Sequence, residues 1–184
     1  DAASPLDHDM ERVDREQVEE ALGRVGFDAE CHVVLYATGV APSAMWATRV
    51  WWQLRAFGFE RCSVLDGGME KWRAEGRRVT TEACAYRPNP AFAFDADRRS
   101  DGLILDTEGV KACLAAGVRG GAVVVDALQE HASPTGMLDG AVRLPWPLLF
   151  DRDAHTFRPA EAVREELRRR GIRAAGDAQR CVAY

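Results

Sequence analysis

The chain has 184 residues, of which 47% are hydrophobic and 29% are charged, which is ordinary for a folded protein and excludes extended disorder. Its net charge of −5 at pH 7 gives no support for a nucleic-acid-binding surface, which requires a net-basic domain. No apolar run approaches the ~18 residues that cross a bilayer, and the acidic, polar start of the chain is not a secretory signal. We therefore expect a globular protein with no nucleic-acid or membrane partner.

The cysteines are five in number, at positions 31, 62, 84, 113 and 181, and none has Cys-x-x-Cys spacing. An odd count without this spacing predicts neither a disulfide framework nor a zinc site, and the four histidines also lack metal-ligand spacing. Cys31, Cys62 and Cys181 lie at or beside predicted strands, where small buried thiols are expected. A reducing cytoplasm is the predicted compartment.

In chain order, the first predicted element is an amphipathic helix at 15–25, which Gly26 would end. A continuous apolar strand follows at 31–36, and this pattern is typical of a sheet covered on both faces. The next predicted elements are a helix at 44–57, a strand at 62–66 and a helix at 69–76. Residues 77–101 contain Pro88, Pro90 and many polar residues and are predicted to be a linker.

The second part of the chain is predicted to open with a strand at 102–106 and a helix at 107–117, with Thr107 as the N-cap. The later predicted elements are strands at 122–127 and 141–146, a helix at 161–172 and a strand at 181–184. Strands that alternate with helices predict an α/β fold with a largely parallel sheet.

Two stretches of the chain repeat each other. EQVEEALGRVGF at 16–27 and EAVREELRRRGI at 161–172 share Glu, Val, Glu, Leu, Arg and Gly at one constant offset. Each predicted helix leads to a strand that begins with cysteine and ends with tyrosine, Tyr36 in the first copy and Tyr184 in the second. The repeat indicates two related units, each only partly represented.

Two longer runs resemble a known family. VVLYATG…RVWWQLRAFGFERCSVLDGGMEKWRAEG, at 33–76, resembles the first domain of tandem-domain rhodaneses, the thiosulfate or 3-mercaptopyruvate sulfurtransferases. VVVDA…GMLDGAVRLPW, at 123–146, resembles the start of their second domain. Gly136, Gly140, Ala141, Val142, Leu144, Pro145 and Trp146 fit the family's G-H-I-P-G-A-V-N-L-P-W-like run, from which Met137, Leu138, Asp139 and Arg143 depart.

The resemblance implies a rhodanese-like parallel sheet flanked by helices, in two tandem units. Residues 1–76 would be the C-terminal part of a first, catalytically silent domain, 77–101 the interdomain linker, and 102–184 the N-terminal part of a second domain. The chain is thus expected to be incomplete at both ends, and residues could also be missing within 128–136.

The resemblance also implies where the nucleophile lies. Ala37 stands at the nucleophile position of the usually silent first domain. In the second domain, a cysteine directly after the strand that here ends at Tyr184 would open a loop whose amides hold a persulfide. Cys181 falls within that strand and is expected in the core. No catalytic, cofactor-binding or metal-binding residue is therefore assigned within this chain.

Several other positions bear on the chemistry of the chain. Asp126 fits the family's Asp-Ala motif, and a structural and a catalytic role are both open for it. Leu128 stands where the family commonly has arginine, and His131 could substitute as a polar group, although a surface-loop histidine is the more ordinary interpretation. The hydroxyls of Thr38 and Ser43 are expected to serve turns or helix caps.

The activity implied by the resemblance is sulfur transfer from thiosulfate or 3-mercaptopyruvate, through a cysteine persulfide, to cyanide or a thiol. It needs no cofactor, and a monomer is expected; the 184-residue chain alone would be inactive. Two alternatives stay open. The first is a catalytically silent rhodanese-like binding or regulatory module, which Ala37 and Leu128 favour. The second is a single permuted sheet formed by both parts of the chain.

Overall fold

The computed structural model describes residues 15–39, 44–95, 103–117, 120–129 and 136–173, and the backbone of 180–183. In chain order its elements are α1 (Arg15–Arg24), β1 (Val33–Leu35), α2 (Ala44–Ala56), β2 (Cys62–Val64), α3 (Gly68–Ala74), α4 (Thr107–Ala116), β3 (Ala122–Asp126), β4 (Val142–Arg143), the 3-10 helix η4 (Trp146–Leu149), β5 (Phe150–Asp151), β6 (Thr156–Phe157), α5 (Ala160–Arg169) and β7 (Arg180–Ala183). Helices alternate with strands, so the predicted α/β class is confirmed. Within the described ranges, no helix is long and apolar enough to cross a membrane.

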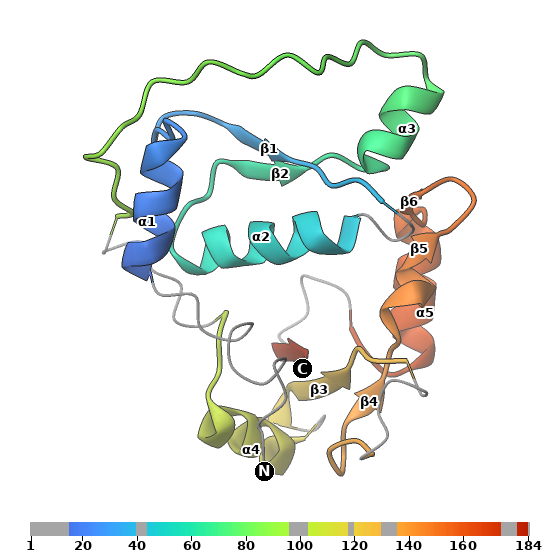
Figure 1. The fold of residues 1–184 in the computed structure, drawn as a ribbon. Helices are drawn as coiled ribbons and strands as arrows, with labels where there is room; N and C mark the ends of the chain where they lie inside the picture. The colour runs from blue at the N-terminus through green and yellow to red at the C-terminus, as the bar shows by residue number, and fades with distance from the viewer. Residues whose placement is uncertain are drawn as a thin grey trace, which may run out of the picture.

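The strands form two parallel sheets and one small hairpin (Figure 1). β1 pairs with β2, whereas β3 lies between β4 and β7 in the order β4-β3-β7. β5 and β6 are antiparallel. A single permuted sheet is therefore wrong for the strands that the structure describes. We call residues 15–95 the first half and residues 103–183 the second half.

The start of the second half differs from the prediction. Leu103 and Ile104, expected in a strand, lie in a bend and are 43% and 52% exposed. Apolar character alone does not make a strand, and none of the strands that the structure describes pairs with this segment. The predicted N-cap is also wrong by one residue: the Asp106 carboxylate accepts a hydrogen bond from the Gly109 amide at 2.8 Å, so Asp106 caps α4 in place of Thr107.

The core of the first half is rich in aromatic side chains. Leu54 from α2 and Phe59 pack with Phe92 and Phe94, which come from the predicted linker. Phe27 lies between two of these rings, with centroids 5.3 Å from both Phe59 and Phe92. Part of the linker is therefore built into this core, although the predicted domain boundaries themselves stay a prediction.

Backbone contacts fix the same part of the linker against α1, and Figure 1 shows it returning from α3 to the side of that helix. The Asn89 amide donates to the Gly23 carbonyl at 2.8 Å, and the Phe94 amide donates to Glu19 at 2.8 Å. Burial by itself raises the pKa of the Glu19 carboxyl, but the bonds from Arg15 and Phe94 outweigh it and hold that pKa below its ordinary value.

The core of the second half surrounds β3, whose five residues are all buried. Val123 and Val125 face one cluster, which includes Ile172, whereas Val124 faces the other cluster with Cys113 of α4. Covering on both faces was expected for the strand at 31–36, and there it is wrong, because Val34 in β1 is 53% exposed. It is β3 that is covered on both faces.

Candidate functional site

The carboxyl ends of the second sheet bring two charged side chains together. In the register of this sheet, Asp126 at the end of β3 is opposite Arg143 at the end of β4. On the other side of β3, Val125 is opposite Ala183, the last described residue of β7. Ligands of parallel α/β sheets bind outside the carboxyl ends of the strands. We call this place, formed by the ends of β3, β4 and β7, the second edge.

Asp126 is the charged residue at the centre of the second edge, and its side chain is fully buried. Its Oδ2 lies 3.1 Å from Nε and 3.0 Å from Nη2 of Arg143. Its Oδ1 accepts a hydrogen bond from the Leu128 amide at 3.0 Å. A buried carboxylate requires a cation and hydrogen-bond donors, and Asp126 has both. The carboxylate thus holds the end of β4 and the loop after β3 together.

In the sequence, Arg143 is only one of the residues that depart from the family's run. The structure gives it a defined place: its guanidinium pairs with Asp126, and its carbonyl accepts a hydrogen bond from Nε of Arg170 in the turn after α5 at 2.8 Å. A signal was present, because an arginine within a short apolar strand needs a buried counter-charge, and the neighbouring strand ends in aspartate. Met137 and Leu138, two other departures, are exposed in the preceding loop.

The other predicted positions of this half are only partly brought together. Leu128 is exposed, and its backbone amide, not its side chain, contacts Asp126. Cys181 lies within β7 opposite Val123, although its side chain is outside the described residues. His131 and Tyr184 also lie outside them.

The corresponding edge of the first half, which we call the first edge, is occupied by a protein carboxylate. Oε1 of Glu70 in α3 accepts the Gly39 amide at 2.7 Å and the Thr38 hydroxyl at 3.0 Å. Amides at such a turn are the donors that would hold an anion. The silence of this loop, expected from Ala37 at the nucleophile position, stays a prediction. Ser43 lies outside the described residues.

The four cysteines with described side chains differ in their burial. Cys62 is buried, and burial raises the pKa of its thiol more than the charge of Arg55 lowers it. Cys113 is also buried, within the core of the second half. Cys31 is exposed, so its predicted burial is wrong: β1 begins only at Val33, which leaves Cys31 in the preceding turn. All four are free thiols.

Comparison with known proteins identifies the kind of domain. Residues 5–75 match the rhodanese-like domain family. The thiosulfate sulfurtransferase of Cricetulus griseus is 42% identical over 78 residues, which are 42% of this chain and 25% of that protein. The sulfur carrier protein TtuD of Thermus thermophilus is 25% identical over 168 residues, 83% of this chain and 56% of that protein. The chain therefore spans a quarter to about half the length of these relatives.

Solved structures extend the likeness to the whole fold. SseA of Escherichia coli, described as a 3-mercaptopyruvate sulfotransferase with the rhodanese fold, aligns with a TM-score of 0.71 at 23% identity, over 100% of this chain and 65% of that one. An anaerobic ergothioneine biosynthesis enzyme of Chlorobium limicola aligns with a TM-score of 0.78 at 18% identity, over 95% of this chain and 46% of that one. The described elements thus form a rhodanese fold. The predicted resemblance to rhodaneses is thus confirmed at the level of the fold and of the domain model that residues 5–75 match.

Proposed function

We propose that this chain is part of a rhodanese-type sulfurtransferase that moves a sulfane sulfur from thiosulfate or 3-mercaptopyruvate to cyanide or a thiol. The observation that carries the proposal is the second edge, where Asp126 at the end of β3 lies between Arg143 of β4 and the end of β7. The relatives named as sulfurtransferases support the same reaction class. In this proposal the nucleophile is a cysteine that follows Tyr184 in the full-length protein.

The proposed reaction has two steps, transfer of sulfur to the cysteine and transfer of that sulfur to the acceptor. The cysteine thiolate attacks the outer sulfur of thiosulfate; a new S–S bond forms, and the old one breaks as sulfite leaves with the electron pair. With 3-mercaptopyruvate, the C–S bond breaks instead, and pyruvate leaves as an enolate that takes up a proton. The acceptor then attacks the outer sulfur of the persulfide, and the cysteine thiolate leaves. Neither step requires a metal or an organic cofactor.

The domain organisation belongs to the same proposal. Residues 1–76 would represent a silent first domain, 77–101 a linker and 102–184 the start of a catalytic second domain. The two separate parallel sheets support this division. A monomeric state and a cytoplasmic location are proposed with it.

The release of thiocyanate from thiosulfate and cyanide tests the proposal. The full-length protein should form thiocyanate, and substitution of the residue after Tyr184 by serine should abolish the reaction. The 184-residue chain alone should show none, because it lacks the proposed nucleophile. Thiocyanate formation that survives the serine substitution would contradict the assignment of the nucleophile.

A second candidate function is a silent rhodanese-like binding module. The contact of Glu70 with the Gly39 amide favours it, because a protein carboxylate occupies the first loop. Turnover separates the two candidates: a full-length protein that binds a partner or an anion but forms no persulfide would be such a module.

A further inference from the structure

We propose that Arg143 binds the anionic group of the sulfur donor. This inference rests on the proposed function, because it names the residue that would recognise the donor in that reaction. Both candidate donors carry a negatively charged oxygen group: the oxygen-bearing end of thiosulfate and the carboxylate of 3-mercaptopyruvate. A planar guanidinium can accommodate either group with two parallel hydrogen bonds.

The first support is the place of the charge. Arg143 belongs to β4, but its Nε and Nη2 lie 3.1 and 3.0 Å from Oδ2 of Asp126, the last residue of β3. β3 lies between β4 and β7, so one strand separates Arg143 from the end of β7. The cation therefore belongs to the same edge at which Ala183 ends the described part of β7.

The second support is the direction of the ion pair. The Asp126 side chain is 0% exposed, whereas that of Arg143 is 28% exposed. The negative end of the pair is thus buried and the positive end faces outward. Guanidinium carries five N–H groups, and the contact with one carboxylate oxygen leaves Nη1 turned away from Asp126. Among the described residues, no second carboxylate forms a salt bridge with Arg143.

The third support is that the neighbouring side chains are either already paired or uncharged. Arg170, the nearby guanidinium, is paired with Glu166 and also donates to the carbonyl of Arg143. Leu128, which follows β3, has no charge. In the described part of the second edge, Arg143 is therefore the cation best placed to meet an anion.

The arrangement is also fixed before any ligand binds. Asp126 holds the guanidinium, and Arg170 holds the backbone of the same residue. A binding group that is already ordered loses little conformational entropy when the ligand arrives. Arg143 is thus an anchored cation rather than a free surface side chain.

The test compares four variants of the full-length protein that contains this sequence. Arg143→Gln removes the charge, Arg143→Lys keeps it, and Asp126→Asn with Arg143→Gln removes both charges of the pair. The control is Arg164→Gln, an exposed arginine of α5. The readouts are the Kd of thiosulfate by calorimetry, KM and kcat with each donor, KM for an uncharged thiol acceptor, and the thermal unfolding midpoint.

Loss of a charge-assisted hydrogen bond should raise Kd and donor KM about tenfold or more in Arg143→Gln, with a smaller rise in Arg143→Lys. The acceptor KM and the Arg164→Gln control should not change. The double variant should recover the unfolding midpoint, because no carboxylate is left buried without a partner, while its Kd stays raised. The donor whose KM rises more is the one that Arg143 recognises.

Three other outcomes would contradict either this inference or the proposed function. If the double variant recovers both the unfolding midpoint and the original Kd, Arg143 serves only as the partner of Asp126 and the inference is overturned. Binding of thiosulfate that depends on Arg143 without any turnover would support the anion site and contradict the proposed sulfur transfer. Turnover with a donor KM independent of Arg143 would support the function and overturn the inference.

Discussion

At the scale of single residues, two carboxylates determine what each edge can bind. Asp126 is buried behind the guanidinium of Arg143, so the second edge presents a positive group. Glu70 instead accepts the Gly39 amide and the Thr38 hydroxyl, so a negative group already takes the donors of the first edge. The Asp126 carboxylate therefore leaves the Arg143 guanidinium available to an anion at the second edge, whereas the Glu70 carboxylate takes the donors that an anion would use at the first edge.

Substitution of Glu70 by alanine tests the contact at the first edge. The variant loses the bonds from Gly39 and Thr38, which lie 31 and 32 positions away in the sequence. The free energy of unfolding should fall by about 1 kcal/mol in a urea titration. Glu82→Ala, an exposed position in the linker, is the matched control and should change little. Equal stability of the two variants would contradict a structural role for Glu70.

The sequence could predict some of these residues and not others. Asp126 is singled out by its fit to the family's Asp-Ala motif at the end of a strand. An arginine in a short apolar strand indicates a buried counter-charge, but its pairing with Asp126 depends on the register between β3 and β4, which no local pattern contains. The contact between Gly39 and Glu70 was missed for the same reason, since α3 brings the carboxylate back to the loop from far along the chain.

At the scale of elements, the sequence predicted the helices well, because each has a periodic pattern and several have a clear stop. Gly26 follows α1 with a φ of +77°, as its predicted role as helix stop requires. The use of Phe92 and Phe94 in the core was not predictable, because isolated aromatic residues in a proline-containing stretch have no periodicity. The linker therefore becomes part of the first half through the packing of these two rings in the core and through its contacts with α1.

Substitution of Gly26 by alanine tests how closely the linker packs on the end of α1. A Cβ at this position would lie 2.5 Å from the Arg87 carbonyl oxygen, in addition to the strain of a positive φ. Gly76 has a similar φ of +68° but nothing within 4 Å, so it is the matched control. By urea unfolding, Gly76→Ala should cost about 1 kcal/mol and Gly26→Ala roughly 2–3 kcal/mol. Equal losses would show that the linker does not pack there.

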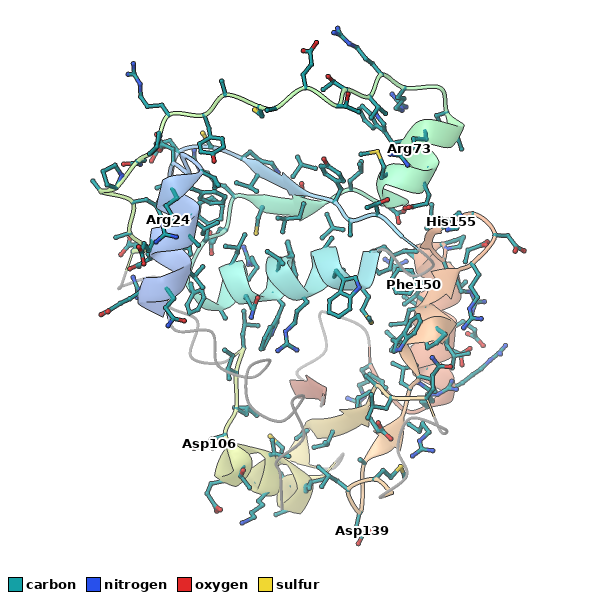
Figure 2. The ribbon with its side chains drawn as sticks, viewed as in Figure 1. Arg24, Arg73, Asp106, Asp139, Phe150 and His155 are labelled. Atoms are coloured by element: carbon teal, nitrogen blue, oxygen red, sulfur yellow. The ribbon has the colours of Figure 1, made fainter. Side chains whose placement is uncertain are left out.

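At the scale of the whole molecule, specific contacts join the two halves. The Phe157 amide of the β5–β6 hairpin donates to Oδ1 of Asp66, just after β2, at 2.8 Å. Figure 2 shows His155 of this region just below α3, and Phe150 lower, level with the end of α2. Nε1 of Trp52 donates to the Leu103 carbonyl at 3.3 Å. The β5–β6 hairpin of the second half thus contacts the first half at the first edge.

The Asp66 contact can be measured by hydrogen exchange. Asp66→Ala removes the acceptor of the Phe157 amide, so exchange at that amide should become about tenfold faster. Asp66→Asn keeps one oxygen acceptor and should retain most of the protection. Amides in β3 serve as an internal reference, because they lie in the other core. Unchanged protection at Phe157 in the alanine variant would mean that the hairpin does not depend on this contact.

Whether the full-length protein carries sulfur on a cysteine is the central question at this scale. Mass spectrometry after incubation with thiosulfate, followed by proteolysis, answers it most directly. We expect the peptide that begins within β7 to gain the mass of one sulfur atom on a cysteine directly after Tyr184, and cyanide to remove it. A full-length protein in which no cysteine follows Tyr184, or in which that peptide gains no sulfur, would contradict sulfur transfer at this site.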